Sequence, residues 1–372
     1  MKSIAFLIHD LGVGGAEKVL VNLVNHMDPA QFDITVIALF GGGVNEQFLA
    51  PHIHYRAVWS RALPGNSKLM KLLSPRQLHR MCVKEHFDAE VAYLEGPAAR
   101  IISGCTDPRT KLFCWIHIEQ HTPACAANAF RSFDESATCY GRFDRIVCVS
   151  ETVREDFCTI YPQLARNTLV RYNTIETDRI LALKEEPTEE PFDPAEQKLV
   201  AVGKISKAKG FDRLARIVKR LRDDGLPVHL YALGVGADQQ EIEAYLREND
   251  LSPYYTFLGY RTNPYCVVAK CDLFVCASWA EGFSTAATEA LIVGTPVCTV
   301  EVSGMREMLG ANDEWGVVTE NTDEALYAGI RALLKQSERL RHYRAQAALR
   351  GKSFSTAATV RAVEELLNGA LL

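Results

Sequence analysis

Two glutamates are the only charged residues between Cys276 and Val300, in the stretch CASWAEGFSTAATEALIVGTPVCTV. Glu281 follows the predicted strand DLFVCAS, and Glu289 lies near the first turn of the next predicted helix. An uncompensated carboxylate in such apolar surroundings costs several kcal/mol, so the pattern indicates a binding partner. Adjacent ribose hydroxyls could donate to Glu289, while hydroxyls of a neighbouring group could donate to Glu281. An internal lysine or arginine is the alternative partner for Glu289.

Three lysines lie between a predicted strand and the next predicted helix in LVAVGKISKAKGFDRL. Lys204, Lys207 and Lys209 come just before a helix N-terminus at Phe211 or Asp212, where unpaired backbone N–H groups attract anions. The ammonium groups and these N–H groups together suit a diphosphate. The glycine spacing is not that of a Walker A loop. Three solvated surface lysines are the alternative interpretation.

A glycine-rich loop, HDLGVGGAEK, follows the first predicted strand. Gly12, Gly14 and Gly15 let the backbone turn tightly and approach a ligand, and the helix starting near Ala16 offers free N–H groups to an anion. Glu17 stands where the third glycine of a dinucleotide-binding motif belongs, which disfavours a nicotinamide-dependent dehydrogenase. A turn that serves packing alone is the alternative.

A histidine ends the predicted strand of CWIHIEQH. Open parallel sheets bind ligands at the carboxyl ends of their strands, which is where His117 falls. A neutral imidazole can donate a hydrogen bond to a sugar hydroxyl or accept one from it. The alternative is a core histidine whose nitrogens are satisfied inside the protein.

Parallel sheets are needed to position these loops, and the sequence predicts two. Short β-rich runs alternate with helical patterns along the whole chain, which is typical of parallel sheets covered by helices on both faces. The first series of strand candidates is SIAFLI, FDITVIALF, EVAYL, KLFCWIHI and RIVCVS, and the second is KLVAVG, PVHLYALG, YTFLGY, DLFVCAS, TPVCTVEV and WGVVTE. Two doubly wound α/β domains that face each other would place all four loops around one interdomain cleft.

The two series are separated by an acidic connection that contains three prolines, LALKEEPTEEPFDPAEQK. We therefore expect a Rossmann-like N-terminal domain at 1–172 and a Rossmann-like C-terminal domain at 173–352. The last segment, 353–372, has helical spacing, and we expect it to pack back on the N-terminal domain.

Composition is that of a folded globular protein. The chain has 372 residues, 48% of them hydrophobic and 23% charged, and a formal net charge of −5 that gives no reason to expect nucleic acid as a partner. Eleven scattered cysteines without Cys-x-x-Cys pairs or zinc-type spacing are typical of reduced thiols in a cytosolic protein. The N-terminal apolar run is too short for a secretory signal, and we expect no membrane-spanning helix.

Ten motifs follow one another along most of the chain: GGAEKVL, WIH, VSETVRE, YNTIE, VGKISKAKGFDRL, LGVGADQQEIEAYL, FLGY, EGFSTAATEA, GTPV and SGMREML. Their order and spacing resemble glycosyltransferase family 4, whose members have the GT-B fold of two facing α/β domains. This resemblance implies transfer of a sugar from a nucleotide sugar, by default a UDP-sugar, with retention of anomeric configuration. It also implies that no cofactor and no metal is needed.

The resemblance also implies roles for particular residues. The diphosphate would contact Lys204 and Lys209. The transferred sugar would contact Glu281 and His117, and the ribose would contact Glu289. Catalytic roles fall on His117, Glu281, Lys209 and Lys204, and donor-binding roles on Gly14, Gly15, Gly203, Gly259, Tyr260, Ser284, Thr285, Ala286 and Glu289. Two features depart from the family pattern: Lys204 stands where arginine is commoner, and YNTIE replaces the usual Asn-Gly-x-Asp.

A basic segment suggests where the acceptor comes from. Between Glu46 and Glu85 there is no acidic residue, whereas seven basic residues occur between positions 56 and 84, with large apolar residues interleaved among them. The basic residues are Arg56, Arg61, Lys68, Lys71, Arg76, Arg80 and Lys84, and the apolar ones include Trp59, Leu63, Leu69, Met70, Leu72 and Leu73. We expect peripheral attachment to anionic lipid on the cytoplasmic face of the cell membrane, with a lipid-linked saccharide as acceptor. A solvated basic face, or an acidic or diphosphate-linked acceptor, would account for the same charges.

Other functions stay open at this level. An epimerase or hydrolase of the same fold would act on a nucleotide sugar without transferring it. A non-catalytic subunit that binds a sugar nucleotide is a third hypothesis, although the presence of both glutamates and both phosphate-binding lysines disfavours it.

Overall fold

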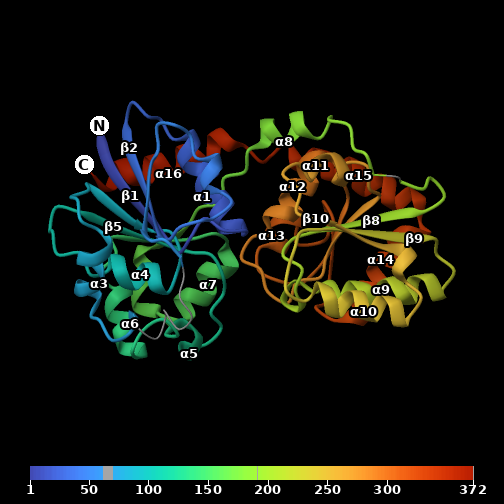
Figure 1. The fold of residues 1–372 in the computed structure, drawn as a ribbon, viewed down its shortest axis with the longest axis horizontal. Coiled ribbons are helices and arrows are strands. Elements are labelled where there is room, and N and C mark those ends of the chain that lie inside the picture. Colours follow the sequence, from blue (N-terminus) through green and yellow to red (C-terminus); the bar gives the residue numbers. More distant parts are fainter. Residues whose placement is uncertain (62–69, 191, 372) are drawn as a thin grey trace. The chain divides into compact units, whose positions relative to one another are not determined.

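The computed structural model describes residues 1–61, 70–190 and 192–371. The chain forms two compact units, which we call the N-terminal unit (Met1–Thr174 with Thr356–Leu372) and the C-terminal unit (Ile175–Ser355). The sequence placed the divisions at 172/173 and 352/353, and the structure places them at 174/175 and 355/356. Both units are α/β, with helices on both faces of a central sheet (Figure 1).

The sheet of the N-terminal unit has seven parallel strands in the order β3-β2-β1-β4-β5-β6-β7. Its strands are β1 Lys2–Ile8, β2 Phe32–Phe40, β3 His54–Trp59, β4 Ala89–Ala92, β5 Lys111–Ile116, β6 Arg145–Cys148 and β7 Thr168–Val170. The apolar runs of the sequence become its buried centre. In β1, for example, Ile4 is 0% exposed and lies in register with Ile34 of β2 and Ala89 of β4.

The helices of this unit include the last helix of the chain. They are α1 Gly15–His26, α3 Pro75–Cys82, α4 Pro97–Ile102, α5 Pro123–Ala126, α6 Phe133–Tyr140, α7 Glu151–Ile160 and α16 Thr356–Ala370. Helix α16 packs on α1, and its Glu364 accepts a hydrogen bond of 2.7 Å from the backbone N–H of Asp28. The chain therefore returns to the N-terminal unit after it has completed the C-terminal unit.

The sheet of the C-terminal unit has six parallel strands in the order β10-β9-β8-β11-β12-β13. Its strands are β8 Gln197–Val202, β9 Val228–Leu233, β10 Tyr255–Gly259, β11 Leu273–Cys276, β12 Val297–Val300 and β13 Val317–Thr319. Its helices are α8 Thr177–Leu183, α9 Phe211–Asp223, α10 Gln239–Glu248, α11 Tyr265–Val268, α12 Thr285–Val293, α13 Met305–Leu309, α14 Asp323–Lys335 and α15 Ser337–Gly351.

Each sheet has one point at which the strand order reverses. It lies between β1 and β4 in the N-terminal unit and between β8 and β11 in the C-terminal unit. The loops that leave the carboxyl ends of these two strands run to opposite sides and leave a crevice between them, where open parallel sheets bind ligands. The lysine loop follows β8 and the Glu281 loop follows β11, so the two predicted loops flank one such point.

None of the described helices is long and apolar enough to cross a membrane. All eleven cysteines are free thiols, and most of them are buried.

Candidate active site

The loop between β8 and α9 is fixed against the end of β11. Gly210, which precedes α9, has a φ of +71°, a left-handed conformation that favours glycine. A Cβ atom at this position would lie 2.0 Å from the carbonyl oxygen of Ala277, so a side chain cannot be accommodated without moving backbone. This close approach brings Lys209 beside the loop that carries Glu281.

Lys209, Glu281 and Ser278 form a hydrogen-bonded group. The Lys209 ammonium lies 2.7 Å from Oε1 of Glu281, and the Ser278 hydroxyl donates to the same oxygen at 2.6 Å. The Glu281 side chain is 12% exposed and that of Lys209 is 37% exposed. The structure thus places an internal cation at Glu281. Glu281 is thus ionically paired before any sugar binds, and one edge of Lys209 still faces solvent.

Glu289 lies one turn into α12, the helix that follows Glu281. It is 7% exposed, and the hydroxyl of Tyr265 donates to its Oε1 at 3.4 Å. Ser284 is the N-cap of this helix, and its hydroxyl accepts from the backbone N–H of Ala287 at 3.3 Å. The helix begins at Thr285, so the N–H groups of its first turn point towards the β11–α12 loop. A buried carboxylate and a helix N-terminus therefore lie on one side of the point at which the strand order of this sheet reverses.

The other two lysines of the loop differ from Lys209. Lys207 pairs with Glu241 of α10 at 2.7 Å, and both side chains are more than half exposed. Lys204 is exposed. The solvated-lysine interpretation thus fits Lys207.

The ends of β8, β9 and β10 meet at one glycine. Gly234 has a φ of +133°, and a Cβ atom there would lie 1.9 Å from the carbonyl oxygen of Gly203. The backbone N–H of Gly234 also donates to the carbonyl of Gly259 at 2.8 Å. Tyr260 follows at 43% exposure. The predicted donor-binding residues Gly203, Gly259 and Tyr260 are therefore held at the same edge of the sheet as the lysine loop.

In the N-terminal unit, His117 follows β5 with one ring nitrogen unsatisfied. Its ring packs on Tyr93 with centroids 5.0 Å apart. Its Nε2 atom is enclosed and has no hydrogen-bond partner among the described residues, so the bond to the backbone of Tyr93 is made by Nδ1. Burial lowers the pKa of His117 to about 4, so the ring is neutral at neutral pH. A satisfied core histidine would have both nitrogens bonded. Here Nε2 remains as an acceptor for a hydroxyl.

Two further groups near this edge were missed by the sequence analysis. Glu95, in the loop after β4, accepts the backbone N–H of His117 at 2.8 Å, and burial raises the pKa of its carboxyl. Asp10, after β1, bonds His9 at 2.6 Å and the N–H of Gly12 at 2.7 Å, and the His9 bond lowers the pKa of Asp10. The rule that selected His117, a polar residue at the carboxyl end of a buried strand, would have selected both.

The predicted glycines Gly14 and Gly15 begin α1. Gly14 is its N-cap, with extended backbone, and Gly15 is its first residue. The helix therefore starts directly behind the loop that Asp10 stabilises, and its N-terminus lies at the carboxyl edge of β1.

Comparisons with known proteins agree with this architecture. The family model "Glycosyl transferases group 1" matches residues 184–350, and the model "Glycosyltransferase Family 4" matches residues 13–179. A Campylobacter jejuni protein, N-acetylgalactosamine-N,N'-diacetylbacillosaminyl-diphospho-undecaprenol 4-alpha-N-acetylgalactosaminyltransferase, is 26% identical over 99% of this chain and 100% of its own.

Solved structures show the same fold. The Anabaena protein HepE in complex with UDP and glucose is similar with a TM-score of 0.76 and 17% identity, over 99% of this chain and 100% of its own. TarM of S. aureus, in a complex that contains UDP, is similar with a TM-score of 0.74 and 14% identity, over 99% of this chain and 100% of its own. The two sheets and these likenesses define a glycosyltransferase of the GT-B fold. The chain belongs to glycosyltransferase family 4.

The Lys209–Glu281 pair can be tested by a double-mutant cycle in urea unfolding. We expect Lys209→Met and Glu281→Gln each to lower the free energy of unfolding. The loss of unfolding free energy in the double variant should be about 1–2 kcal/mol smaller than the sum of the two single losses. The reason is that each single variant leaves a partly buried partner without its hydrogen bond. The cycle of Lys207→Met and Glu241→Gln, an exposed pair from the same loop, is the control and should couple by less than about 0.5 kcal/mol. Additive losses at Lys209 and Glu281 would contradict the pairing.

Proposed function

We propose that the protein is a retaining glycosyltransferase that moves a hexosyl or N-acetylhexosaminyl group from a UDP-sugar to a hydroxyl of a lipid-linked saccharide. The observation that carries this proposal is the group formed by Lys209, Glu281 and the N-terminus of α12. It combines a cation, a hydroxyl-binding carboxylate and free N–H groups within two adjacent loops. These are the functional groups that a diphosphate joined to a sugar requires.

The relatives support this choice of substrates. The name of the Campylobacter protein describes a diphospho-undecaprenol-linked saccharide as acceptor and an α-N-acetylgalactosaminyl group as the sugar transferred. Complexes of HepE contain UDP or UDP-glucose. A Mycobacterium tuberculosis relative, 27% identical over 60% of this chain and 57% of its own, is named for GDP-mannose and a phosphatidylinositol acceptor. Lipid-linked acceptors are thus named in two of these relatives, and the second name also gives a donor, GDP-mannose.

In this proposal each predicted residue has one task. Glu289 binds the ribose, Lys204 and Lys209 bind the diphosphate, and Glu281 and His117 bind hydroxyls of the sugar. The backbone around the glycines and the start of α12 completes the donor site, with Gly14, Gly15, Gly203, Ser284, Thr285 and Ala286 near phosphates and Gly259 and Tyr260 near the base.

The charges favour departure of the nucleoside diphosphate. Negative charge grows on the diphosphate as its bond to the sugar breaks, and Lys204, Lys209 and the α12 N-terminus stabilise it without reorganisation. Lys209 is already oriented by Glu281, so its ammonium can be shared between the carboxylate and a phosphate oxygen. The acceptor hydroxyl attacks the face that the diphosphate leaves and gives its proton to the departing phosphate, which retains configuration. No metal is needed because these cations neutralise the leaving group.

Transfer can be distinguished from the other reactions of a nucleotide sugar by product analysis. We expect UDP release from UDP-N-acetylgalactosamine, UDP-N-acetylglucosamine or UDP-glucose only when a polyprenyl-diphosphate saccharide is added, with a mass increase of one sugar on the acceptor. Glu281→Gln should lower kcat by at least about a hundredfold, since it removes the charge that orients Lys209. UDP release without acceptor would indicate a hydrolase, and a changed sugar without UDP release an epimerase.

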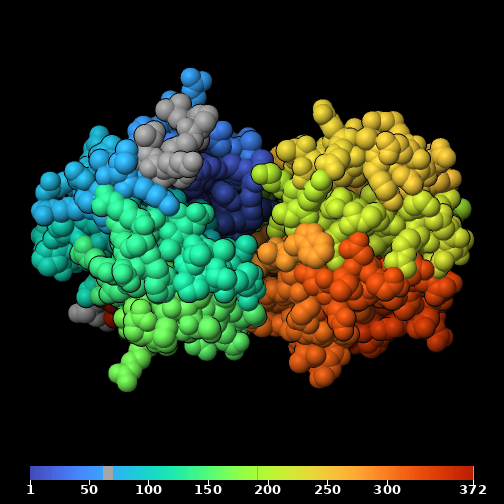
Figure 2. Space-filling view, turned by 90° about the horizontal axis from the view of Figure 1, so that it is seen from below, coloured from blue at the N-terminus to red at the C-terminus, as the bar shows by residue number. Residues whose placement is uncertain are grey.

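The basic segment bears on the site of action, and the structure describes it in part. Leu63, Lys68 and Leu69 lie outside the described residues. Arg56 pairs with Glu85 at 3.0 Å, so its charge is compensated, whereas Arg76, Arg80 and Lys84 are exposed on and beside α3. Figure 2 shows the residues from 70 onwards, in light blue, at the surface of the N-terminal unit.

Two arginines fix the backbone of the turn that precedes α3, on which an apolar side chain is exposed. Arg100 donates to the carbonyls of Met70 and Leu73, and Arg131 donates to those of Lys71 and Leu72, at 2.6 to 2.9 Å. Leu72 is 75% exposed on the turn that they fix. A surface hollow of about 510 Å³ adjoins α3, with Trp59 and Met81 among its lining residues. Exposed apolar groups close to cations in the sequence suit the interface of an anionic bilayer.

Vesicle binding tests this surface. We expect the protein to bind vesicles that contain anionic phospholipid at low salt and to dissociate as salt rises. Arg80→Ala with Lys84→Ala should weaken binding roughly 30-fold, at about 1 kcal/mol for each charge. Leu72→Asp should also weaken it, whereas Leu349→Asp, a control leucine 56% exposed in the C-terminal unit, should not. Equal binding by all variants, or none by the wild type, would contradict membrane attachment through this segment.

A further inference from the structure

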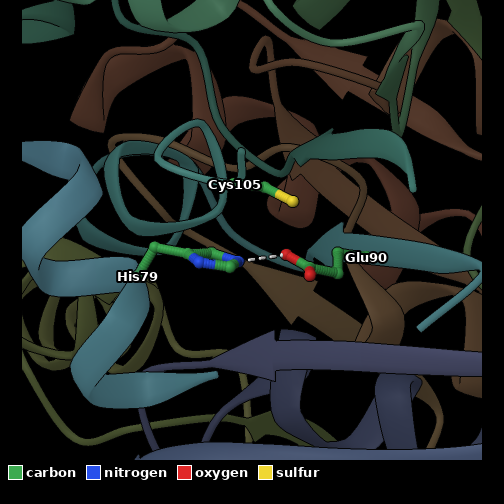
Figure 3. A group of neighbouring side chains, drawn as sticks. All are labelled: His79, Glu90 and Cys105. Atoms are coloured by element: carbon green, nitrogen blue, oxygen red, sulfur yellow. Dashed lines mark hydrogen bonds and ion pairs between the residues drawn. The ribbon is translucent and has the colours of Figure 1, made fainter. Parts of the chain in front are cut away.

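Three side chains with metal-binding atoms converge inside the N-terminal unit, away from the proposed transfer site. They are His79 of α3, Glu90 of β4 and Cys105, which follows α4 (Figure 3). The imidazole nitrogen, the carboxylate oxygen and the thiol sulfur all lie within 4.8 Å of one another. His79 is 13% exposed, Glu90 2% and Cys105 3%. A buried group of this kind demands an explanation because carboxylates and imidazoles are rarely enclosed together in a core.

We propose that His79, Glu90 and Cys105 bind a single zinc ion. Imidazole, thiolate and carboxylate are the three protein ligands that zinc prefers, at about 2.0–2.3 Å each, with tetrahedral geometry. Tetrahedral ligands at those distances lie roughly 3.3–3.8 Å apart. The present separations bracket this range: His79 and Glu90 are hydrogen-bonded at 2.7 Å, and the group spans at most 4.8 Å. The carboxylate would move outwards by about half an ångström, and a water would complete the coordination.

The surrounding backbone holds the three ligands in place. Arg142 donates to the carbonyls of Ser103 and Cys105 at 2.6 and 2.7 Å, which fixes the turn that carries the thiol. Gly104 lies so close to α3 that a Cβ atom there would be 2.0 Å from the carbonyl oxygen of Pro75. The turn and the first residue of α3 are thus in contact, and a rigid scaffold of this kind favours metal binding over collapse.

The ion would bind with release of protons. Burial alone would lower the pKa of His79, but its hydrogen bonds to Cys105 and Glu90 and the charge of Glu90 raise it to about 9. Zinc takes the place of the His79 proton between imidazole and carboxylate, and the Cys105 thiol gives up a second proton on becoming a thiolate.

The site is separate from the proposed sugar-transfer site. Glu90 lies in register with Leu112 of β5, five strand residues before His117, which is roughly 16 Å along the sheet. An ion there joins α3, β4 and the turn after α4. No sequence motif indicates it, because the ligands come from three separate elements.

Metal content of the full chain tests the site. Protein stripped with a chelator under a phosphine reductant is dialysed against buffered zinc, and bound metal is counted by mass spectrometry. We expect close to one zinc for each wild-type chain, and an affinity at least about tenfold lower for Cys105→Ser and for His79→Gln. Magnesium in excess should not displace the zinc.

His121→Gln is the matched control. Among the described residues His121 belongs to a second group with a similar spacing, Glu119, His121 and Asp156, but it is 63% exposed. This variant should bind zinc as the wild type does. Wild-type protein loaded with cobalt should show thiolate charge-transfer absorption. This measurement does not depend on whether any variant folds. The proposal would be overturned if the wild type retained no zinc, or if His121→Gln lost zinc while Cys105→Ser kept it. Cobalt-loaded wild type without a thiolate absorption band would also overturn it. None of these outcomes would affect the proposed transfer function.

Discussion

The ion pair between Lys209 and Glu281 is the contact on which the proposed chemistry depends. It joins the loops after β8 and β11, which flank the point where the strand order of the C-terminal sheet reverses. A carboxylate that is 12% exposed requires a partner, and the ammonium provides one in the absence of ligand. The cation is therefore fixed beside a helix N-terminus before a diphosphate arrives. Such prior orientation is what makes electrostatic stabilisation of a leaving group effective.

The sheets could be predicted from the sequence because parallel strands buried on both faces are continuous apolar runs. All eleven strand candidates contain or overlap a strand of the structure, from β1 to β13, while the edge strands β3 and β7 were not recognised. The candidate site followed from one further rule, that ligands bind at carboxyl ends of parallel strands. That rule located His117, Lys209 and Glu281. The class of the enzyme, in contrast, came from resemblance in motif order.

Side-chain pairing could not be predicted, because it depends on how loops distant in sequence approach one another. Lys209 and Glu281 are brought together by the backbone contact of Gly210 with Ala277, which no spacing reveals. Glu95 follows a buried strand and could have been selected from the sequence, but its bond to the backbone N–H of His117 could not. The group of His79, Glu90 and Cys105 is invisible for the same reason, since a helix, a strand and a turn each supply one residue.

The proposed donor site requires that the buried Glu289 binds the ribose of a nucleotide sugar, and calorimetric titration with UDP measures this binding. We expect the wild type to bind UDP and Glu289→Gln to bind it at least about tenfold more weakly, since the substituted side chain lacks the charge-assisted bonds to two hydroxyls. Glu248→Gln, the same change at an exposed position of α10, should bind as the wild type does. If the wild type binds UDP and Glu289→Gln binds it with the same affinity, Glu289 does not bind the ribose.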